Sequence, residues 1–153
     1  METIKVVSLV IEKVGSLKVE TKKVTSVAAA ADVLMSYLSQ LDREHFVVLN
    51  LDNKGNVNSF HVAHVGILDQ TLMHPRELFK VAIISNAKSI ILGHNHPSGD
   101  LTPSQVDIEA TQLLIQAGKL LGIPVQDHLI VGQGNYYSML ENNPELFRKG
   151  TKL

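Results

Sequence analysis

The sequence predicts an α/β fold in which helices pack on both faces of a mixed β-sheet. Segments that favour strands alternate along the chain with segments that favour helices, and strand–helix–strand connections favour parallel pairing. Short turns between apolar runs add antiparallel hairpins to the same sheet. The chain has 153 residues, of which 44% are hydrophobic, so residues 1–153 are expected to form a single domain around one sizeable core.

The first half of the chain is predicted to supply most of the hairpins. Residues 6–14 are rich in Val, Ile and Leu, and they favour a strand that pairs with residues 17–22 across a Gly-Ser turn. A helix is expected over residues 27–41, where apolar side chains recur at spacings of three and four. Residues 46–51 are apolar on both faces, which indicates a central strand, and residues 57–65 follow as its hairpin partner.

The second half continues the alternation of strands and helices. The expected elements are a loop over residues 66–70, a helix from Pro75, a buried strand over residues 89–93, a long helix from Ser104 to a Gly122 stop, strands over residues 124–131 and 136–139, a short helix from Asn143 and a polar tail over residues 148–153. The long helix is expected to turn these apolar residues toward the sheet: Val106, Ala110, Leu113, Leu114, Ala117, Leu120 and Leu121.

Composition limits the classes of function. The formal net charge is −1, so no overall field attracts nucleic acid or an anionic membrane; a DNA partner is possible but unsupported by charge. The N-terminus lacks the apolar segment of a signal peptide and no apolar run is long enough to span a bilayer, which predicts a cytoplasmic protein. The chain has no cysteine, so any metal must be held by His, Asp or Glu.

The richest chemical signal is a histidine pair at the end of an apolar run. His94 and His96 are separated by one residue, so in extended backbone their side chains point to the same side. A Pro/Gly/Ser loop follows, and Asp107 lies in the first turn of the next predicted helix. A catalytic zinc commonly has three protein ligands and an open position for water. The pattern therefore predicts a Zn²⁺ site formed by His94, His96 and Asp107.

Each part of this pattern also has a purely structural interpretation. A His-x-His sequence in a loop is a short motif that often arises without metal binding. Ser104 and Asp107 form a Ser-x-x-Asp sequence, which resembles a capping box at a helix start. The two interpretations of Asp107 are compatible because its carboxylate has two oxygens.

The complete set of residues resembles a known family. His-x-His, seven residues, then Ser-x-x-Asp is the zinc signature of the JAMM (JAB/MPN-type) metallopeptidases, and it matches His94, His96, Ser104 and Asp107 without a gap. The sequence resembles the RadC branch of that superfamily over roughly residues 25–141. Further matching stretches are residues 74–77 (His-Pro-Arg-Glu) and Asp127-His128. The resemblance implies a JAB/MPN fold, which is cytidine-deaminase-like, with an α-β-α arrangement.

The resemblance also implies roles for two further residues. Its signature includes a glutamate at the start of a central strand, and Glu44 occupies that place as general base. The family serine donates a hydrogen bond to the developing oxyanion, which gives Ser104 that role. The structural alternatives are a solvated charge at a strand end for Glu44 and a helix N-cap for Ser104. RadC proteins usually carry an N-terminal helical hairpin region, and nothing before Val24 resembles one.

Other polar residues carry weaker signals. Asp127 and His128 could orient a metal ligand, or His128 could be a buried histidine bonded to backbone. The remaining histidines lack ligand spacing and are expected to be structural or on the surface; they are His45, His61, His64 and His74.

Three functions compete. The first is a zinc peptidase or isopeptidase that hydrolyses an amide in a peptide or protein substrate. The second is a DNA-associated repair protein or nuclease, which the charge balance and the missing helical hairpin disfavour. The third is a non-catalytic zinc-bearing binding module, which the intact residue set disfavours. A zinc nucleobase deaminase is excluded because it needs cysteine ligands. The sequence leaves the oligomeric state open.

Overall fold

A five-stranded mixed sheet forms the centre of the computed structural model, which describes residues 1–67 and 73–148. The strands are β1 (His45–Leu51), β2 (Val57–Val65), β3 (Ser89–Asn95), β4 (Val125–Val131) and β5 (Tyr136–Ser138). They lie in the order β2-β1-β3-β4-β5. The β3–β4 pair is parallel and the other pairs are antiparallel. The crossover through a helix between β3 and β4 explains their parallel pairing.

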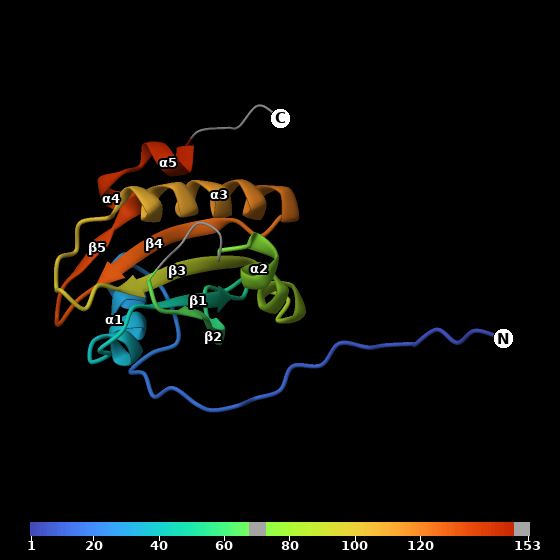
Figure 1. Ribbon diagram of the computed structural model, residues 1–153. Helices are drawn as coiled ribbons and strands as arrows, with labels where there is room; N and C mark the ends of the chain where they lie inside the picture. Colours follow the sequence, from blue (N-terminus) through green and yellow to red (C-terminus); the bar gives the residue numbers. More distant parts are fainter. Residues whose placement is uncertain (68–72, 149–153) are drawn as a thin grey trace.

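Helices cover both faces of this sheet, as predicted. They are α1 (Val27–Leu38), α2 (Pro75–Ile84), α3 (Gln105–Leu121), α4 (Met139–Asn142) and α5 (Glu145–Arg148). Figure 1 shows α1 on one side of the strands and α3 along the other side, with α2 beside it. The α/β class and the mixed sheet with helices are therefore confirmed.

The sheet divides the buried side chains into two clusters. Phe46 and Val48 of β1 join Leu78, Phe79 and Leu114 on the side of α2 and α3. Alternate residues of the same strand face α1, because successive side chains in a strand point to opposite faces. The second cluster contains, among others, Ala30, Leu34, Val47, Leu49 and Ile91.

The strand β3 is the most enclosed part of the sheet, since all seven of its residues are buried. It extends two residues beyond the predicted end at Gly93, so His94 and Asn95 belong to it. Gly93 allows α1 to approach closely, because a Cβ at this position would lie 2.5 Å from Leu34 Cδ2. The backbone that carries His94 is therefore held between two strands and a tightly packed helix.

The helix α3 begins and ends where the sequence predicts, but part of its predicted buried face is wrong. Ser104 is the N-cap and Gly122, with φ of 71°, ends the helix in left-handed conformation. Leu113 and Leu120 are 45% and 76% exposed, and Leu121 is 46% exposed at the last residue. The buried positions are 107, 110, 111, 114, 115 and 118, so Leu113 and Leu120 fall on the far side of the helix.

The predicted hairpin of residues 6–14 with residues 17–22 is also wrong. Neither range contains a strand, and the side chains of residues 1–16, which we call the N-terminal segment, are exposed. Figure 1 shows this segment running away from the sheet. The backbone first meets the sheet region at Lys23, which forms an isolated bridge with Asn56, the residue before β2. A two-stranded hairpin with no further sheet or helix to pack on is at best marginally stable in water, which explains the difference.

Smaller differences concern the ends of elements. The predicted strand 136–139 ends at Ser138 because Met139 already begins α4. The helix expected over residues 27–41 stops at Leu38. The predicted loop residues 68–70 and tail residues 149–153 lie outside the described residues. Across the described ranges, the helices do not combine the length and the apolar character that crossing a bilayer requires.

Candidate metal centre

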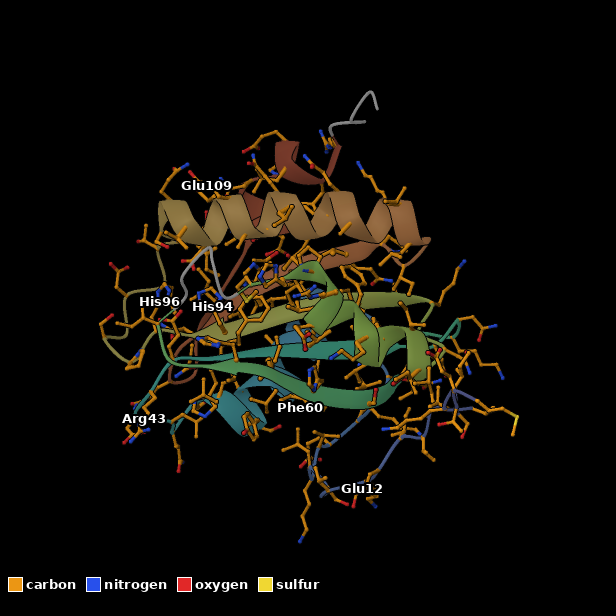
Figure 2. The ribbon with its side chains drawn as sticks, turned by 45° about the vertical axis from the view of Figure 1, so that its right-hand side comes forward. Glu12, Arg43, Phe60, His94, His96 and Glu109 are labelled. Carbon is orange, nitrogen blue, oxygen red and sulfur yellow. The ribbon has the colours of Figure 1, made fainter. Side chains whose placement is uncertain are left out.

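The C-terminal end of β3 presents two imidazoles to one point. His94 is fully buried, and His96, one residue beyond the strand, remains partly exposed. Their Nε2 atoms lie 3.0 Å apart. Figure 2 shows both side chains at the same end of the sheet, below the half of α3 that carries Glu109. The spacing of two residues thus brings both rings to one side, as extended backbone requires.

The loop after His96 folds back so that α3 adds a carboxylate. Gly99, with φ of 81°, allows the turn, and its N–H donates to the carbonyl of His96 at 2.9 Å. Asp107 then lies in the first turn of α3, with Oδ1 3.4 Å from His94 Nε2 and Oδ2 3.4 Å from His96 Nε2. The structure therefore brings together the three predicted ligands.

Ser104 and Asp107 also form the capping box that the sequence suggested. The Asp107 N–H donates to Ser104 Oγ at 3.1 Å, and the Ser104 N–H donates to Asp107 Oδ2 at 2.7 Å. Asp107 therefore serves the helix start and the histidine cluster at once. The cap also fixes the carboxylate, because its rotamer is tied to the backbone three residues earlier.

Glu44 reaches the same place from the neighbouring strand. It precedes β1, which pairs with β3 so that Phe46 lies opposite His94. The half-buried Glu44 carboxylate, His94, His96 and Asp107 offer ligand atoms within 4.8 Å of one another. Among the described residues, this is the group of side chains that could hold a metal ion.

Asn95 is a positioning residue that the sequence analysis missed. Its Oδ1 accepts from the N–H of His45 at 2.8 Å, and its Nδ2 donates to the carbonyl of Arg43 at 2.9 Å. These two bonds fix the backbone on both sides of Glu44. Its place between the two histidines predicts only that its side chain points to the opposite face of the strand, and nothing in the sequence indicates its bonds to residues 43 and 45.

The electrostatics of the cluster suit a cation. Burial raises the pKa of the Asp107 carboxyl, but hydrogen bonds to His94 and His96 outweigh burial, so the pKa lies well below its ordinary value. The hydrogen bond to Asp107 raises the pKa of His96. Burial raises the pKa of Glu44, and the nearby His94 and His96 oppose that shift. Asp107 is thus held as an anion, while Glu44 takes up a proton more readily than an exposed glutamate.

Each histidine ring has a partner on its other nitrogen. His96 Nδ1 lies 2.6 Å from the carbonyl oxygen of Asp100, and His94 Nδ1 lies 2.7 Å from Nε2 of His128. A carbonyl can only accept, so His96 carries a proton on Nδ1 and turns the Nε2 lone pair toward the cluster when it is neutral. Both ring nitrogens of His128 bond to side chains, one of them to His94, rather than to backbone.

Asp127 has a separate, structural environment. Its carboxylate accepts from Ser138 Oγ at 2.6 Å, from the Leu140 N–H at 2.9 Å and from the His128 N–H at 2.7 Å. It therefore ties β4 to the start of α4. The other histidines, His45, His61, His64 and His74, are outside the four-residue group, as predicted.

A hollow of about 310 Å³ opens beside the cluster. Its lining includes His96, Ser98 and Asn95 from the end of β3, and Gln133 and Asn135 from the turn after β4. Leu38, Leu41 and Val131 also line it, so the hollow offers both apolar surface and hydrogen-bonding side chains next to His96.

Comparison with known proteins agrees with this architecture. A family model described as "RadC-like JAB domain" matches residues 24–144. A UPF0758 protein of Syntrophomonas wolfei is 50% identical over 111 residues, which cover 72% of this chain and 47% of that protein. A UPF0758 protein of Staphylococcus haemolyticus is 46% identical over 122 residues, covering 80% and 54%.

A third relative, a UPF0758 protein of Thermosynechococcus vestitus, is 47% identical over 121 residues, covering 79% of this chain and 48% of the relative. The chain thus spans about half the length of the curated relatives it matches. Their names state no activity. The family match covers most of the chain, including all four residues of the cluster, and the chain therefore belongs to the RadC-like JAB domain family.

Proposed function

We propose that this protein is a zinc-dependent hydrolase that cleaves an amide bond in a peptide or protein substrate. His94, His96 and Asp107 would hold the zinc ion, and Glu44 would act as general base. The single observation that carries the proposal is the convergence of two imidazole Nε2 atoms and a carboxylate beside a second, half-buried carboxylate.

The spacing of the donor atoms fits zinc. Zn–N and Zn–O distances of about 2.0–2.1 Å place tetrahedral ligand atoms about 3.3–3.4 Å apart. The two Nε2 atoms lie 3.0 Å apart, and each has an oxygen of Asp107 at 3.4 Å, Oδ1 for His94 and Oδ2 for His96. With no thiolate in the chain, a set of two histidines and one carboxylate is typical of a catalytic zinc site that keeps one position open.

Residues of this chain would divide the work of hydrolysis. When bound, zinc polarises a carbonyl and lowers the pKa of a coordinated water to about 7. Glu44 takes a proton from the attacking water and passes it to the leaving nitrogen, and its raised pKa suits both transfers. Ser104 uses an oxygen lone pair for the cap, so its hydroxyl proton remains available for the carbonyl oxygen that gains negative charge.

The test combines metal analysis with a cleavage screen. Protein purified without chelator should contain one zinc per chain, and His96→Ala should lose most of it. A library of peptides and isopeptide-linked peptides should reveal a cleaved sequence. Glu44→Gln is the matched control, because it preserves size and polarity but cannot accept a proton; it should keep zinc and lose cleavage.

Each negative result has a distinct meaning. Zinc content unchanged in His96→Ala would contradict the ligand assignment. Equal cleavage by the wild type and Glu44→Gln would contradict the general base. A zinc-loaded wild type that cleaves nothing in the screen would favour the non-catalytic zinc-bearing module, and cleavage of DNA instead of peptides would favour the repair-associated alternative.

A further inference from the structure

His128 lies behind the proposed metal ligands rather than among them. It is in β4, is fully buried, and packs edge-on against Phe46 at 5.2 Å between ring centroids. Both ring nitrogens bond to side chains: Nε2 lies 2.7 Å from His94 Nδ1 and Nδ1 lies 2.6 Å from Thr111 Oγ1. Any buried histidine needs hydrogen-bond partners; what distinguishes His128 is that one of its partners is the ring of a proposed metal ligand.

The direction of these hydrogen bonds follows from one backbone atom. Thr111 Oγ1 lies 2.6 Å from the carbonyl oxygen of Asp107, which can only accept, so the hydroxyl proton belongs to that bond. His128 must then donate from Nδ1 to Thr111. A neutral imidazole has one N–H, so Nε2 of His128 accepts, and His94 donates from Nδ1.

The two hydrogen-bonding partners of His128 do not favour a second ring proton. His128 is fully buried, and its ring bonds to His94 and Thr111, neither of which carries a negative charge. A buried charge without an opposite charge beside it is costly, so His128 holds one ring proton and the directions above apply.

We propose that His128 and Thr111 are positioning residues that hold His94 in the tautomer with its proton on Nδ1, so that the Nε2 lone pair faces the metal position. The inference rests on the proposed zinc site. The bonds also close a ring, because Thr111 ends on the carbonyl of Asp107, whose carboxylate faces His94 at 3.4 Å. Two ligand residues from different elements, β3 and α3, are thereby tied together through β4.

Partners of this kind orient a ligand ring and raise its basicity, and their loss typically weakens metal binding by about 10–100-fold. Thr111→Val removes the hydroxyl while keeping the shape, and Thr111→Ser restores it. His128→Leu removes both ring nitrogens, whereas His128→Gln keeps an acceptor and a donor at the end of the side chain. Recovery of zinc affinity in Thr111→Ser or His128→Gln would show that the hydrogen bonds, and not the packing, are responsible.

The experiment measures zinc affinity by competition with a chromophoric chelator for these four variants and the wild type. Thr111→Val and His128→Leu should bind zinc about 10–100-fold more weakly, and Thr111→Ser and His128→Gln should bind within a few-fold of the wild type. Ile115→Val, in the buried face of α3, is the matched control for lost packing; it should lower the melting temperature and leave zinc affinity unchanged.

A second measurement does not depend on affinity. Long-range ¹H–¹⁵N correlation spectra of the imidazoles in zinc-free protein should show His94 protonated on Nδ1, and His128 protonated on Nδ1 and unprotonated on Nε2. His94 without a proton on Nδ1, or wild-type zinc affinity in Thr111→Val, would overturn the inference. If His128→Leu does not fold, the zinc affinities of Thr111→Val and Thr111→Ser test the inference. A wild type that binds no zinc would instead overturn the proposed function. The spectra would still test the hydrogen-bond directions among His94, His128 and Thr111.

Discussion

The strand β3 and residues 6–14 of the N-terminal segment have similar composition and opposite environments. Both are rich in aliphatic side chains, and both are predicted as strands. All residues of β3 are buried, whereas Val6 and Val14 are 99% and 93% exposed. Apolar β-branched composition therefore indicates that a segment can form a strand, but it does not indicate whether a partner is available.

The difference lies in the neighbours. The strand β3 is paired on both edges, with β1 and β4, and helices cover both faces of the sheet. The N-terminal segment is exposed and pairs with none of the five strands that the structure describes. The cluster of His94, His96, Asp107 and Glu44 lies at the end of the enclosed strand, where the backbone is held by pairing on both sides. Rigid backbone support of this kind is what holds the side chains of a site in a fixed geometry.

The largest effect at the end of β3 that carries the cluster is expected from Ser104→Ala. If the proposed hydrolysis is correct, loss of this donor lowers the rate by about 100–1,000-fold. Loss of the N-cap bond to the Asp107 N–H separately costs about 1 kcal/mol of the free energy of unfolding. Turnover on a cleaved peptide and denaturant unfolding measure the two effects. Normal values in both would remove both roles from Ser104.

The candidate metal centre was more predictable from sequence than the N-terminal segment. His94, His96 and Asp107 lie in a pattern whose local geometry, an extended pair and a capped helix start, already directs the three side chains together. The assignment of Glu44 to the site required the family resemblance, because its place beside the histidines depends on the pairing of β1 with β3. Asn95 and the contact of His128 with His94 depend on long-range packing, and their spacing in sequence carries no sign of it. The hairpin that residues 6–14 were expected to form shows the same limit, because its sequence did not indicate whether a packing partner exists.

Zinc removal should lower the free energy of unfolding by a moderate amount. A ligand that binds only the folded state at 100 times its Kd adds about 2.7 kcal/mol to the free energy of unfolding. Thermal unfolding with zinc and after chelator treatment measures this difference. If the melting temperature at saturating zinc equalled that after chelator treatment, a specific zinc site would be contradicted.

The size of this zinc effect should increase with pH. In zinc-free protein, the pKa of His96 is raised by its bond to Asp107, so protonation of His96 stabilises the fold below the ordinary histidine value of about 6.5. That stabilisation is lost as the pH rises through the raised pKa. Zinc competes with the proton for Nε2, so zinc binding strengthens over the same range. The gap between the two melting temperatures should widen from about pH 6 to pH 8, and it should not do so in His96→Ala.

Two glycines compare the regions directly. Gly93→Ala would place a Cβ 2.5 Å from Leu34 Cδ2 in the buried core, whereas a Cβ at Gly15 would meet nothing within 4 Å. We expect Gly93→Ala to cost about 1–3 kcal/mol of the free energy of unfolding, the range for overpacked cores. Gly15→Ala is the matched control and should change it by less than about 0.5 kcal/mol. Chemical denaturation measures both, and equal effects would contradict the contrast in packing.

The smallest effect is expected from deleting residues 2–16. These side chains are exposed and lie outside the two buried clusters, so their removal exposes little new apolar surface. The free energy of unfolding should change by less than about 0.5 kcal/mol, and zinc content should stay the same. Denaturant unfolding and metal analysis of the shortened chain, against the full chain, make the comparison. A loss of several kcal/mol would mean that the segment packs in solution, and the hairpin that its sequence predicts would then be the better description of residues 6–14.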